Sequence, residues 1–332
     1  MPAAEERQPL QPKHPGFPAD PALKAALSIG AISAGKGDVV VAGSFGMGIF
    51  RSENRGGKWE AASNGLTDKF ILCLTTGPDG TIYAGTLRGG VFRSKDQGKS
   101  WQVLNNGLTR MQVKALMLAG SELYAGTGGG VYRLTVGEDR WREVTTGLEE
   151  ILVHTLVMGP DKILFAGTSG KGIMRYNPKD PHGQGWSRMT DGLIDHEGMR
   201  ENFIRVLTLR NKEALYAGTF DGGVFRSGDG GRSWRPISKA LPNDSIRGIV
   251  ADEHGLFVAT GRGIFKSLDE GKQWMPINQG LTELAVQVLS VSPDGVLYAG
   301  TSSGTFRSEN HGAQWVSIND GLEVTEGFHL PF

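Results

Sequence analysis

The feature that most constrains the fold is a seven-fold internal repeat. One unit contains an apolar segment, a Tyr-Ala-Gly-Thr segment, a Phe-Arg-Ser segment, a Gly-containing turn that ends in tryptophan, and Asn-Gly-Leu. The repeated alanine is found at Ala42, Ala84, Ala125, Ala166, Ala217, Ala259 and Ala299, with spacings of 42, 41, 41, 51, 42 and 40 residues. The 7 tryptophans occur once per unit, at Trp59, Trp101, Trp141, Trp186, Trp234, Trp274 and Trp315. Such a period indicates one supersecondary unit used repeatedly.

Each unit contains four short β patterns and no helical periodicity. In the second unit the predicted strands are Ile71–Thr75, Thr81–Gly85, Val91–Ser94 and Trp101–Leu104. Four strands in each unit of about 40 residues are typical of β-propeller blades. We therefore predict an all-β fold, a single seven-bladed β-propeller of four-stranded antiparallel blades.

The repeat also predicts the domain organisation. Residues 1–26 form an extended, Pro-rich N-terminal segment, residues 27–322 form the propeller, and residues 323–332 form a C-terminal tail. On this frame no blade combines strands from both ends of the chain. Two modes of ring closure stay open: blades 1 and 7 pack directly, or the tail completes the seam.

Composition excludes several classes of protein. The 35 Lys and Arg residues balance the 35 Asp and Glu residues, so no overall charge attracts nucleic acid. The single cysteine, Cys73, excludes an intramolecular disulfide framework. We find no membrane-spanning run of about 18 apolar residues and no secretory signal at the N-terminus. The sequence as written indicates the cytoplasm, whereas a removed signal peptide would place the protein in the periplasm or outside the cell.

Five units carry a Ser-x-Asp/Asn-x-Gly turn before their tryptophan. A short Asp or Asn side chain can accept hydrogen bonds from the N–H groups of its own turn, and tryptophan offers a large apolar face for packing. A motif repeated around a ring does not converge on one catalytic site. We therefore interpret these residues as structural, neither catalytic nor calcium-binding. They are Asn54, Asp96, Asp229, Asp269 and Asn310.

These turns resemble the Asp-box, or BNR, repeats of a β-propeller superfamily. That superfamily includes sialidases, sortilin-type receptors, xyloglucan-cleaving hydrolases and the photosystem II assembly/stability factors. In size and repeat style the chain is most similar to the photosystem II factors and their bacterial relatives. The resemblance implies the propeller fold, and function must be argued from the sites because propellers host many activities.

The innermost strand of each predicted blade carries a variable second position among apolar neighbours. An isolated polar residue in an apolar strand must reach water or a partner, and the nearest water is the central channel. We predict a basic arc at one channel mouth that binds an anion or an acidic peptide. The alternative is that these residues pair with local acids such as Glu149 or Asp244, or sit among ordinary channel waters. The predicted binding residues are Lys114, His154, Arg205, Arg247 and Gln287; Gly30 and Leu72 complete the ring.

The fourth unit contains an insertion, Ile194–Asn202, between its last strand and the next unit. Insertions in repeat proteins map to loops and often to the binding face. We expect Asp195, His196 and Arg200 to overhang the same mouth as a binding loop. Adjacent residues rarely all face one ion, so we expect no metal there.

An arginine or lysine recurs in the Phe-Arg-Ser segment. A residue repeated at one register belongs to the scaffold, and we interpret its stem as covering apolar surface while its charge stays in water. The positions are Arg51, Arg93, Arg133, Arg175, Arg226, Lys266 and Arg307.

The sequence shows no convergent nucleophile, base or carboxylate pair. Glycan hydrolysis requires two acids that face each other, yet the candidates are scattered among the blades: Asp68, Asp195, Asp221 and Asp244. We therefore predict a non-catalytic protein-binding or complex-assembly platform without a cofactor, a monomer or a subunit of a larger complex. Its partner would be a protein with acidic or anionic groups. The alternative is a glycan-binding or glycan-hydrolysing, sialidase-like protein.

Overall fold

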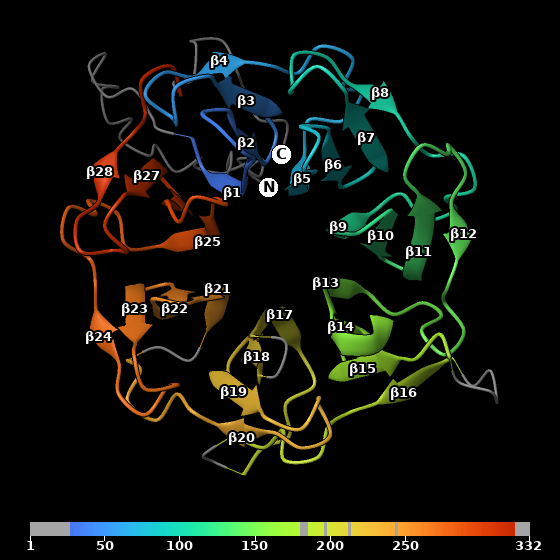
Figure 1. The fold of residues 1–332 in the computed structure, drawn as a ribbon, viewed down its shortest axis with the longest axis vertical. Coiled ribbons are helices and arrows are strands. Elements are labelled where there is room, and N and C mark those ends of the chain that lie inside the picture. Colours follow the sequence, from blue (N-terminus) through green and yellow to red (C-terminus); the bar gives the residue numbers. More distant parts are fainter. Residues whose placement is uncertain (1–26, 180–184, 196–197, 212–213, 243–244, 323–332) are drawn as a thin grey trace, which may run out of the picture.

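The structure is a computed structural model that describes residues 27–179, 185–195, 198–211, 214–242 and 245–322. Seven four-stranded antiparallel sheets surround a central channel, and in each sheet the strands follow sequence order outward (Figure 1). This confirms the predicted seven-bladed propeller. The predicted N-terminal segment and C-terminal tail lie outside the described residues.

Each blade has four strands, counted from the channel outward. The first strands are β1 (Ile29–Ala34), β5 (Ile71–Thr76), β9 (Val113–Ala119), β13 (Val153–Met158), β17 (Ile204–Arg210), β21 (Ile246–Asp252) and β25 (Val286–Val291). The second strands are β2 (Val40–Ser44), β6 (Ile82–Thr86), β10 (Glu122–Thr127), β14 (Leu164–Thr168), β18 (Ala214–Thr219), β22 (Gly255–Thr260) and β26 (Leu297–Thr301). The third strands are β3 (Ile49–Ser52), β7 (Val91–Ser94), β11 (Gly130–Thr135), β15 (Ile173–Tyr176), β19 (Val224–Ser227), β23 (Gly263–Ser267) and β27 (Gly304–Ser308). The fourth strands are β4 (Glu60–Ala61), β8 (Gln102–Val103), β12 (Arg142–Glu143), β16 (Trp186–Arg188), β20 (Arg235–Pro236), β24 (Met275–Pro276) and β28 (Val316–Ser317).

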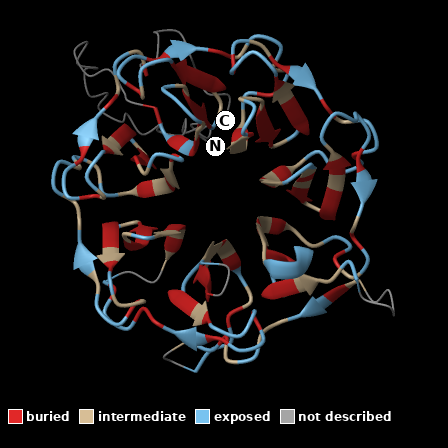
Figure 2. Ribbon diagram, in the orientation of Figure 1, coloured by how far each residue is buried: buried red, intermediate tan, exposed pale blue. Residues whose placement is uncertain are grey.

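The described residues contain one further element, a 3-10 turn at Pro160–Lys162, and no helix among them is long and apolar enough to span a membrane. The predicted strand bounds of the second blade differ from the observed ones by at most one residue at each end. The fourth strand is shorter than predicted because the backbone N–H of Trp101 donates to Asn64 of the preceding blade, at 2.9 Å. The outer strands are largely exposed and the second strands are buried (Figure 2).

The second strand of each blade is buried on both faces because a neighbouring blade covers it. In blade 2, a Cβ on Gly85 would collide with Val113, the first residue of the next blade's inner strand. The same close approach joins Gly300 of the last blade to Ile29 of the first. In six blades this distance leaves room only for a residue without a side chain, which explains the glycine of the Ala-Gly-Thr segment.

The register of blade 6 differs from the prediction. Val258 pairs with Phe265, as Ala217 pairs with Phe225 in blade 5. Val258 therefore occupies the alanine position, and Ala259 occupies the glycine position. Assigning Ala259 to the alanine series was wrong by one residue, because an alanine type alone does not distinguish the two positions.

The tryptophans join each blade to the one before it. The Trp101 indole N–H donates to the carbonyl of Ala62 in blade 1, at 2.8 Å, and its ring is buried. Trp59 repeats this contact across the ring closure, donating to Ile318 of blade 7 at 2.7 Å. Trp234 departs from the pattern and donates to Gly231 of its own turn, at 3.1 Å.

The Asp-box turns are held by their own side chains. In blade 2 the Ser94 hydroxyl donates to Asp96 at 2.7 Å, and the Ser100 N–H donates to the same carboxylate oxygen at 2.9 Å. The hydrogen bond from the Ser100 hydroxyl is the main cause that lowers the pKa of Asp96 to about 2. The equivalent bonds in the other box turns involve Asn54, Asp229, Asp269 and Asn310. These residues act within their turns, which agrees with the structural interpretation.

In four blades the basic residue of the Phe-Arg-Ser segment contacts the next blade, so the interpretation that its charge stays in water was wrong for Arg51, Arg226, Lys266 and Arg307. The Arg51 Nε donates to the carbonyl of Gln97 in the next blade's Asp-box turn, at 2.6 Å, and Arg51 is buried. Lys266 reaches the equivalent carbonyl of His311 at 3.5 Å. Gln97 and His311 both have positive φ, and only the folded turn reveals this acceptor.

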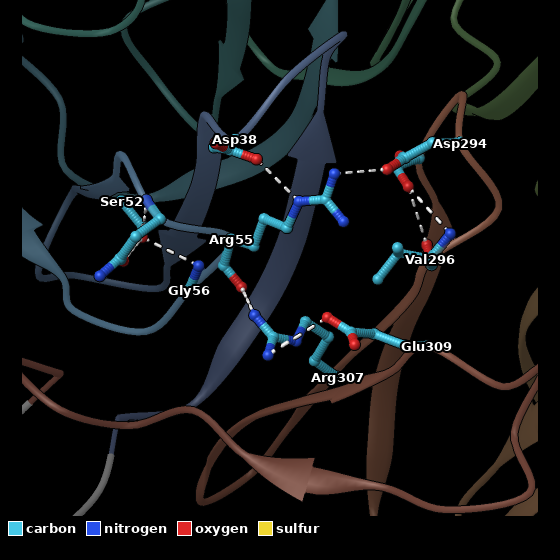
Figure 3. A network of polar contacts seen from close by, with 10 residues as sticks. Asp38, Ser52, Arg55, Gly56, Asp294, Val296, Arg307 and Glu309 are labelled. Atoms are coloured by element: carbon cyan, nitrogen blue, oxygen red, sulfur yellow. Dashed lines mark hydrogen bonds and ion pairs between the residues drawn. The ribbon is translucent and has the colours of Figure 1, made fainter.

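The ring closes by the same type of contact (Figure 3). Arg307 of blade 7 donates to the carbonyl of Arg55 in blade 1, at 2.9 Å. The Arg55 guanidinium pairs with Asp38 of its own blade at 2.7 Å and with Asp294 of blade 7 at 2.8 Å. Blades 1 and 7 therefore pack directly, and the tail that the second predicted mode involves lies outside the described residues.

Trp101→Ala should lower the free energy of unfolding by about 3–5 kcal/mol, as large-to-small core substitutions do. The change removes a buried ring and leaves the Ala62 carbonyl without its donor. Urea denaturation measures the loss, and Trp101→Phe, which keeps a ring, should lose less. A loss under about 1 kcal/mol for the alanine variant would contradict a packing role.

Arg51→Met and Arg93→Met form a matched pair that tests the link between blades. Arg51→Met should cost about 1.5–3 kcal/mol, the range for hydrogen bonds to charged groups. Arg93→Met should cost less, because the Arg93 Nε is buried without a hydrogen-bond partner and the next blade lacks an Asp box. Equal losses in urea denaturation would show that the contact with the Gln97 carbonyl contributes nothing.

Candidate functional site

A β-bulge occurs at the second residue of every inner strand. In blade 2, Ile71 pairs with Thr86 and Cys73 pairs with Gly85, so Leu72 between them has no partner in the ladder. The same register shift recurs in all other blades. A bulge re-aims the side chain of its extra residue. The bulge residues are Gly30, Leu72, Lys114, His154, Arg205, Arg247 and Gln287.

All seven bulge residues line one cavity of about 670 Å³ at the channel. Each innermost strand contributes its bulge residue, and the turns of the same face add the rim. The structure thus brings Lys114, His154, Arg205, Arg247 and Gln287 together around one axis. The remaining lining residues are Ser28, Phe45, Ile71, Ser169, Phe203, Ile204 and Phe220.

The basic side chains contact neutral groups. The Arg205 guanidinium lies 4.4 Å from the centre of the Phe220 ring, and Arg247 donates to the Val286 carbonyl at 3.4 Å. The His154 Nε2 lies 2.6 Å from the Ser169 hydroxyl.

No carboxylate among the described residues lies within 4.0 Å of a side-chain nitrogen of Lys114, Arg205 or Arg247. Of the acids proposed as alternative partners, Glu149 accepts the Gly147 N–H at 2.9 Å, and Asp244 lies outside the described residues. Within the described part of the chain, the basic arc is therefore not neutralised by ion pairs.

Burial and mutual repulsion set the protonation of the arc. Burial, with the neighbouring charges of Lys114 and Arg205, lowers the pKa of His154 to about 4. Burial also lowers the pKa of Lys114 and that of Arg205, and Arg247 adds to the latter effect. At neutral pH the imidazole is therefore neutral.

The Ile194–Asn202 insertion folds back on itself and joins the face that carries the cavity. The Met199 N–H donates to the Asp195 carboxylate at 2.7 Å, so Asp195 helps to hold the turn. The Asn202 carbonyl accepts the Gly170 N–H, at 2.9 Å, from the turn between β14 and β15. Arg200 is exposed, and His196 lies outside the described residues.

Sequence reasoning missed two features of this face. Glu201 is buried, and burial together with Asp221 and Asp195 raises its pKa to about 7; nothing in the sequence distinguished it from an exposed loop acid. Phe45 and Phe220 are 58% and 56% exposed at the rim. Their signal was present, because both follow the second strand directly, where other blades have Leu, Gly or Ser.

The described lining of the cavity contains no Asp or Glu. Asp68, one of the scattered acids, is buried and accepts N–H groups of Phe70 at 3.0 Å and Gly89 at 2.9 Å, so it holds a turn. Among the described residues no group of three or more His, Cys, Asp or Glu side chains could hold a metal ion.

His154 should titrate with a pKa of about 4, and Arg205→Gln should raise this pKa because one like charge is removed. The pKa of an unfolded histidine is about 6.5, so the unfolded state binds the extra proton first and this group's contribution to stability falls as pH drops from about 6.5 to 4. NMR titration of the histidine ring protons measures the pKa of His154, and the signal missing from the His154→Gln variant identifies this residue. A pKa at or above about 6.5 would contradict the described surroundings.

Comparison with known proteins supports the repeat and the fold. Residues 49–61, which include Asn54, match the family model described as BNR-Asp box repeat. No curated protein sequence matches the chain.

Solved structures of other proteins share the architecture at low identity. A GH74 xyloglucanase from Xanthomonas campestris aligns with a TM-score of 0.70 and 14% identity, over 90% of this chain and 55% of that one. The extracellular domain of a putative one-component system from B. thetaiotaomicron aligns with a TM-score of 0.68 and 17% identity, over 85% of this chain and 38% of that one. PorZ, a surface component of the type-IX secretion system of Porphyromonas gingivalis, aligns with a TM-score of 0.65 and 14% identity, over 89% of this chain and 38% of that one.

This chain therefore spans about half or less of the length of those proteins, and such identities establish fold alone. The chain is a seven-bladed β-propeller that carries BNR-Asp box repeats.

Proposed function

We propose that this protein is a non-catalytic protein-binding or complex-assembly platform that binds its partner at the channel-mouth face. The observation that carries the proposal is the cavity itself. Lys114, Arg205 and Arg247 face one open space, and no described carboxylate neutralises them. Half-buried cations are costly to keep unpaired, so a ligand that supplies negative charge gains more there than at the surface.

Exposed apolar side chains on the same face support a protein partner. Contiguous apolar surface on a soluble domain marks interaction sites. The turns that surround the cavity expose large apolar residues to solvent. These residues are Phe45, Met111, Ile194, Met199, Phe203, Phe220 and Leu284.

The partner presents acidic or anionic groups to the arc formed by Lys114, His154, Arg205, Arg247 and Gln287. The loop residues Asp195 and Arg200 form a second contact with the partner, and His196, also predicted for this loop, lies outside the described residues. The resemblance in size and repeat style to the photosystem II assembly/stability factors supports an assembly role.

A glycan-hydrolysing function is the competing candidate, because solved neighbours include a GH74 xyloglucanase. Glycoside hydrolysis uses two carboxyl groups that flank the bond, and the described lining of this cavity supplies neither. This observation favours binding over hydrolysis. We also propose an extracellular or periplasmic location, supported by neighbours that are extracellular or surface components.

The double variant Arg205→Glu/Arg247→Glu tests the proposal. Immobilised wild-type protein should retain an acidic partner from the native organism, and the double variant should lose it because the arc is reversed in charge. Retention should also weaken at 1 M salt, where the Debye length falls to about 3 Å. Quantitative mass spectrometry of the retained proteins measures both effects.

Arg232→Glu/Arg235→Glu is the matched control, because both residues are exposed on the same blade as Arg205, outside the cavity lining. This control should retain the partner as the wild type does. Two results would contradict the proposal: equal loss in both double variants, or turnover of a sialoside or β-glucan that the cavity substitutions abolish.

A further inference from the structure

The described wall of the cavity carries its basic side chains on one side, where blade 5 also adds the apolar residues Phe203, Ile204 and Phe220 beside Arg205. Apart from Ser28, blades 1 and 2 contribute Gly30, Leu72, Ile71 and Phe45, none of which carries a side-chain polar group. Blades 3 to 6 contribute Lys114, His154, Arg205 and Arg247 of the basic arc, and blade 7 contributes Gln287. Strands β1 and β5 lie across the channel from β17 (Figure 1). The apolar wall, formed by Gly30, Phe45, Ile71 and Leu72, therefore faces the arginine wall, formed around Arg205 and Arg247.

The arginine wall is shaped to receive a flat anionic group beside an apolar one. Arg205 lies against the ring of Phe220, at 4.4 Å, and Arg247 occupies the equivalent bulge in the next blade. A guanidinium presents several N–H donors in one plane, which match the two oxygens of a carboxylate. No described carboxylate occupies these donors.

The apolar wall favours an apolar group of the ligand over a charged one. Leu72 takes the bulge position where blades 3 to 6 have basic residues, and Phe45 is 58% exposed at the rim. A compact hydrated anion leaves this wall in contact with water, whereas a ligand with an apolar group covers it. Burial of apolar area contributes about 25 cal/mol per Å².

From this arrangement, and resting on the proposed function, we propose that the cavity recognises a carboxylate that carries an apolar group. The carboxylate binds Arg205 and Arg247, and the apolar group lies toward Leu72 and Phe45. A volume of about 670 Å³ is large enough for such a ligand, because small-molecule sites span about 300–1,000 Å³. The same chemistry exists in a free organic acid and in a polypeptide that ends in an apolar residue.

Three small probes test the two walls separately. 3-Phenylpropionate carries both groups, propionate carries the carboxylate alone, and 3-phenylpropionamide carries the ring without the charge. We expect 3-phenylpropionate to bind at least about tenfold more tightly than either, since each wall needs to contribute only about 1.4 kcal/mol. NMR titration of the intact protein measures the three dissociation constants.

Two variants test which wall binds the apolar group of the probe and which wall binds its carboxylate. Leu72→Gln should bring 3-phenylpropionate to within about threefold of propionate while propionate binding is unchanged, because the apolar contact alone is lost. Arg205→Gln should weaken both carboxylates and leave the amide unchanged. The matched controls are Val103→Gln and Arg235→Gln, exposed positions on the fourth strands of the same two blades. Thermal unfolding of each variant confirms that it is folded.

His154 reports whether the probe binds in this cavity. It lies in the lining, and Lys114 and Arg205 help to suppress its protonation. A bound carboxylate offsets those charges and should raise the imidazole pKa, while the amide should leave it unchanged. A probe that binds without moving this pKa lies elsewhere, and that result would overturn the proposal.

The outcomes separate this inference from the proposed function. Equal binding of propionate and 3-phenylpropionate, or no detectable binding of either at millimolar concentration, would overturn the recognition of an apolar carboxylate even if a protein partner is still retained. Binding with the expected order supports it even if no partner is found.

A peptide probe distinguishes the two sources of the carboxylate. N-acetyl-glycyl-phenylalanine should bind more tightly than 3-phenylpropionate if the natural ligand is the C-terminus of a polypeptide. Tighter binding of the free acid instead assigns the cavity to a small organic acid, with the same two walls.

Discussion

The contact on which the rest of the structure depends is the close approach between one blade and the next. In six blades a glycine lets the first strand of the following blade pack directly on the second strand, and in every blade but the fifth a tryptophan N–H bonds back to the preceding blade. Gly300 and Trp59 repeat both contacts across the ends of the ring, and among the described residues every blade is built from consecutive strands. Each contact holds two blades together at once.

The binding surface follows from the same geometry. Tight packing between blades leaves the inner strand one direction in which a polar side chain can reach water, and the β-bulge aims one residue per blade that way. The close approach between blades is made by the neighbouring residues of the inner strand, so the bulge position varies in chemistry from Gly30 and Leu72 to Arg205 and Arg247. Of these, Arg247 also donates to the Val286 carbonyl of the next blade. A symmetric fold thus presents an asymmetric cavity.

Much of the fold could be predicted because the repeat is visible in residue types. The spacing of the tryptophans predicted seven blades, and the apolar register of the inner strands predicted which side chains meet at the channel. The prediction failed where residue type was ambiguous or the partner was distant. Ala259 could not be distinguished from a repeat alanine, and the partner of Arg51 is a backbone carbonyl whose direction depends on a positive φ at Gln97.

The sequence by itself determined the number of blades, the position of the Asp-box turns and the ring of bulge residues, because these follow from local patterns repeated at a nearly constant period. Only the tertiary structure decided how blades 1 and 7 pack, that the described surroundings of the arginines lack a carboxylate, and that Phe220 stands exposed beside Arg205 while Phe45 is exposed on the opposite wall. Those properties depend on which side chains from different blades come within a few ångströms, and no pattern within one repeat encodes that distance.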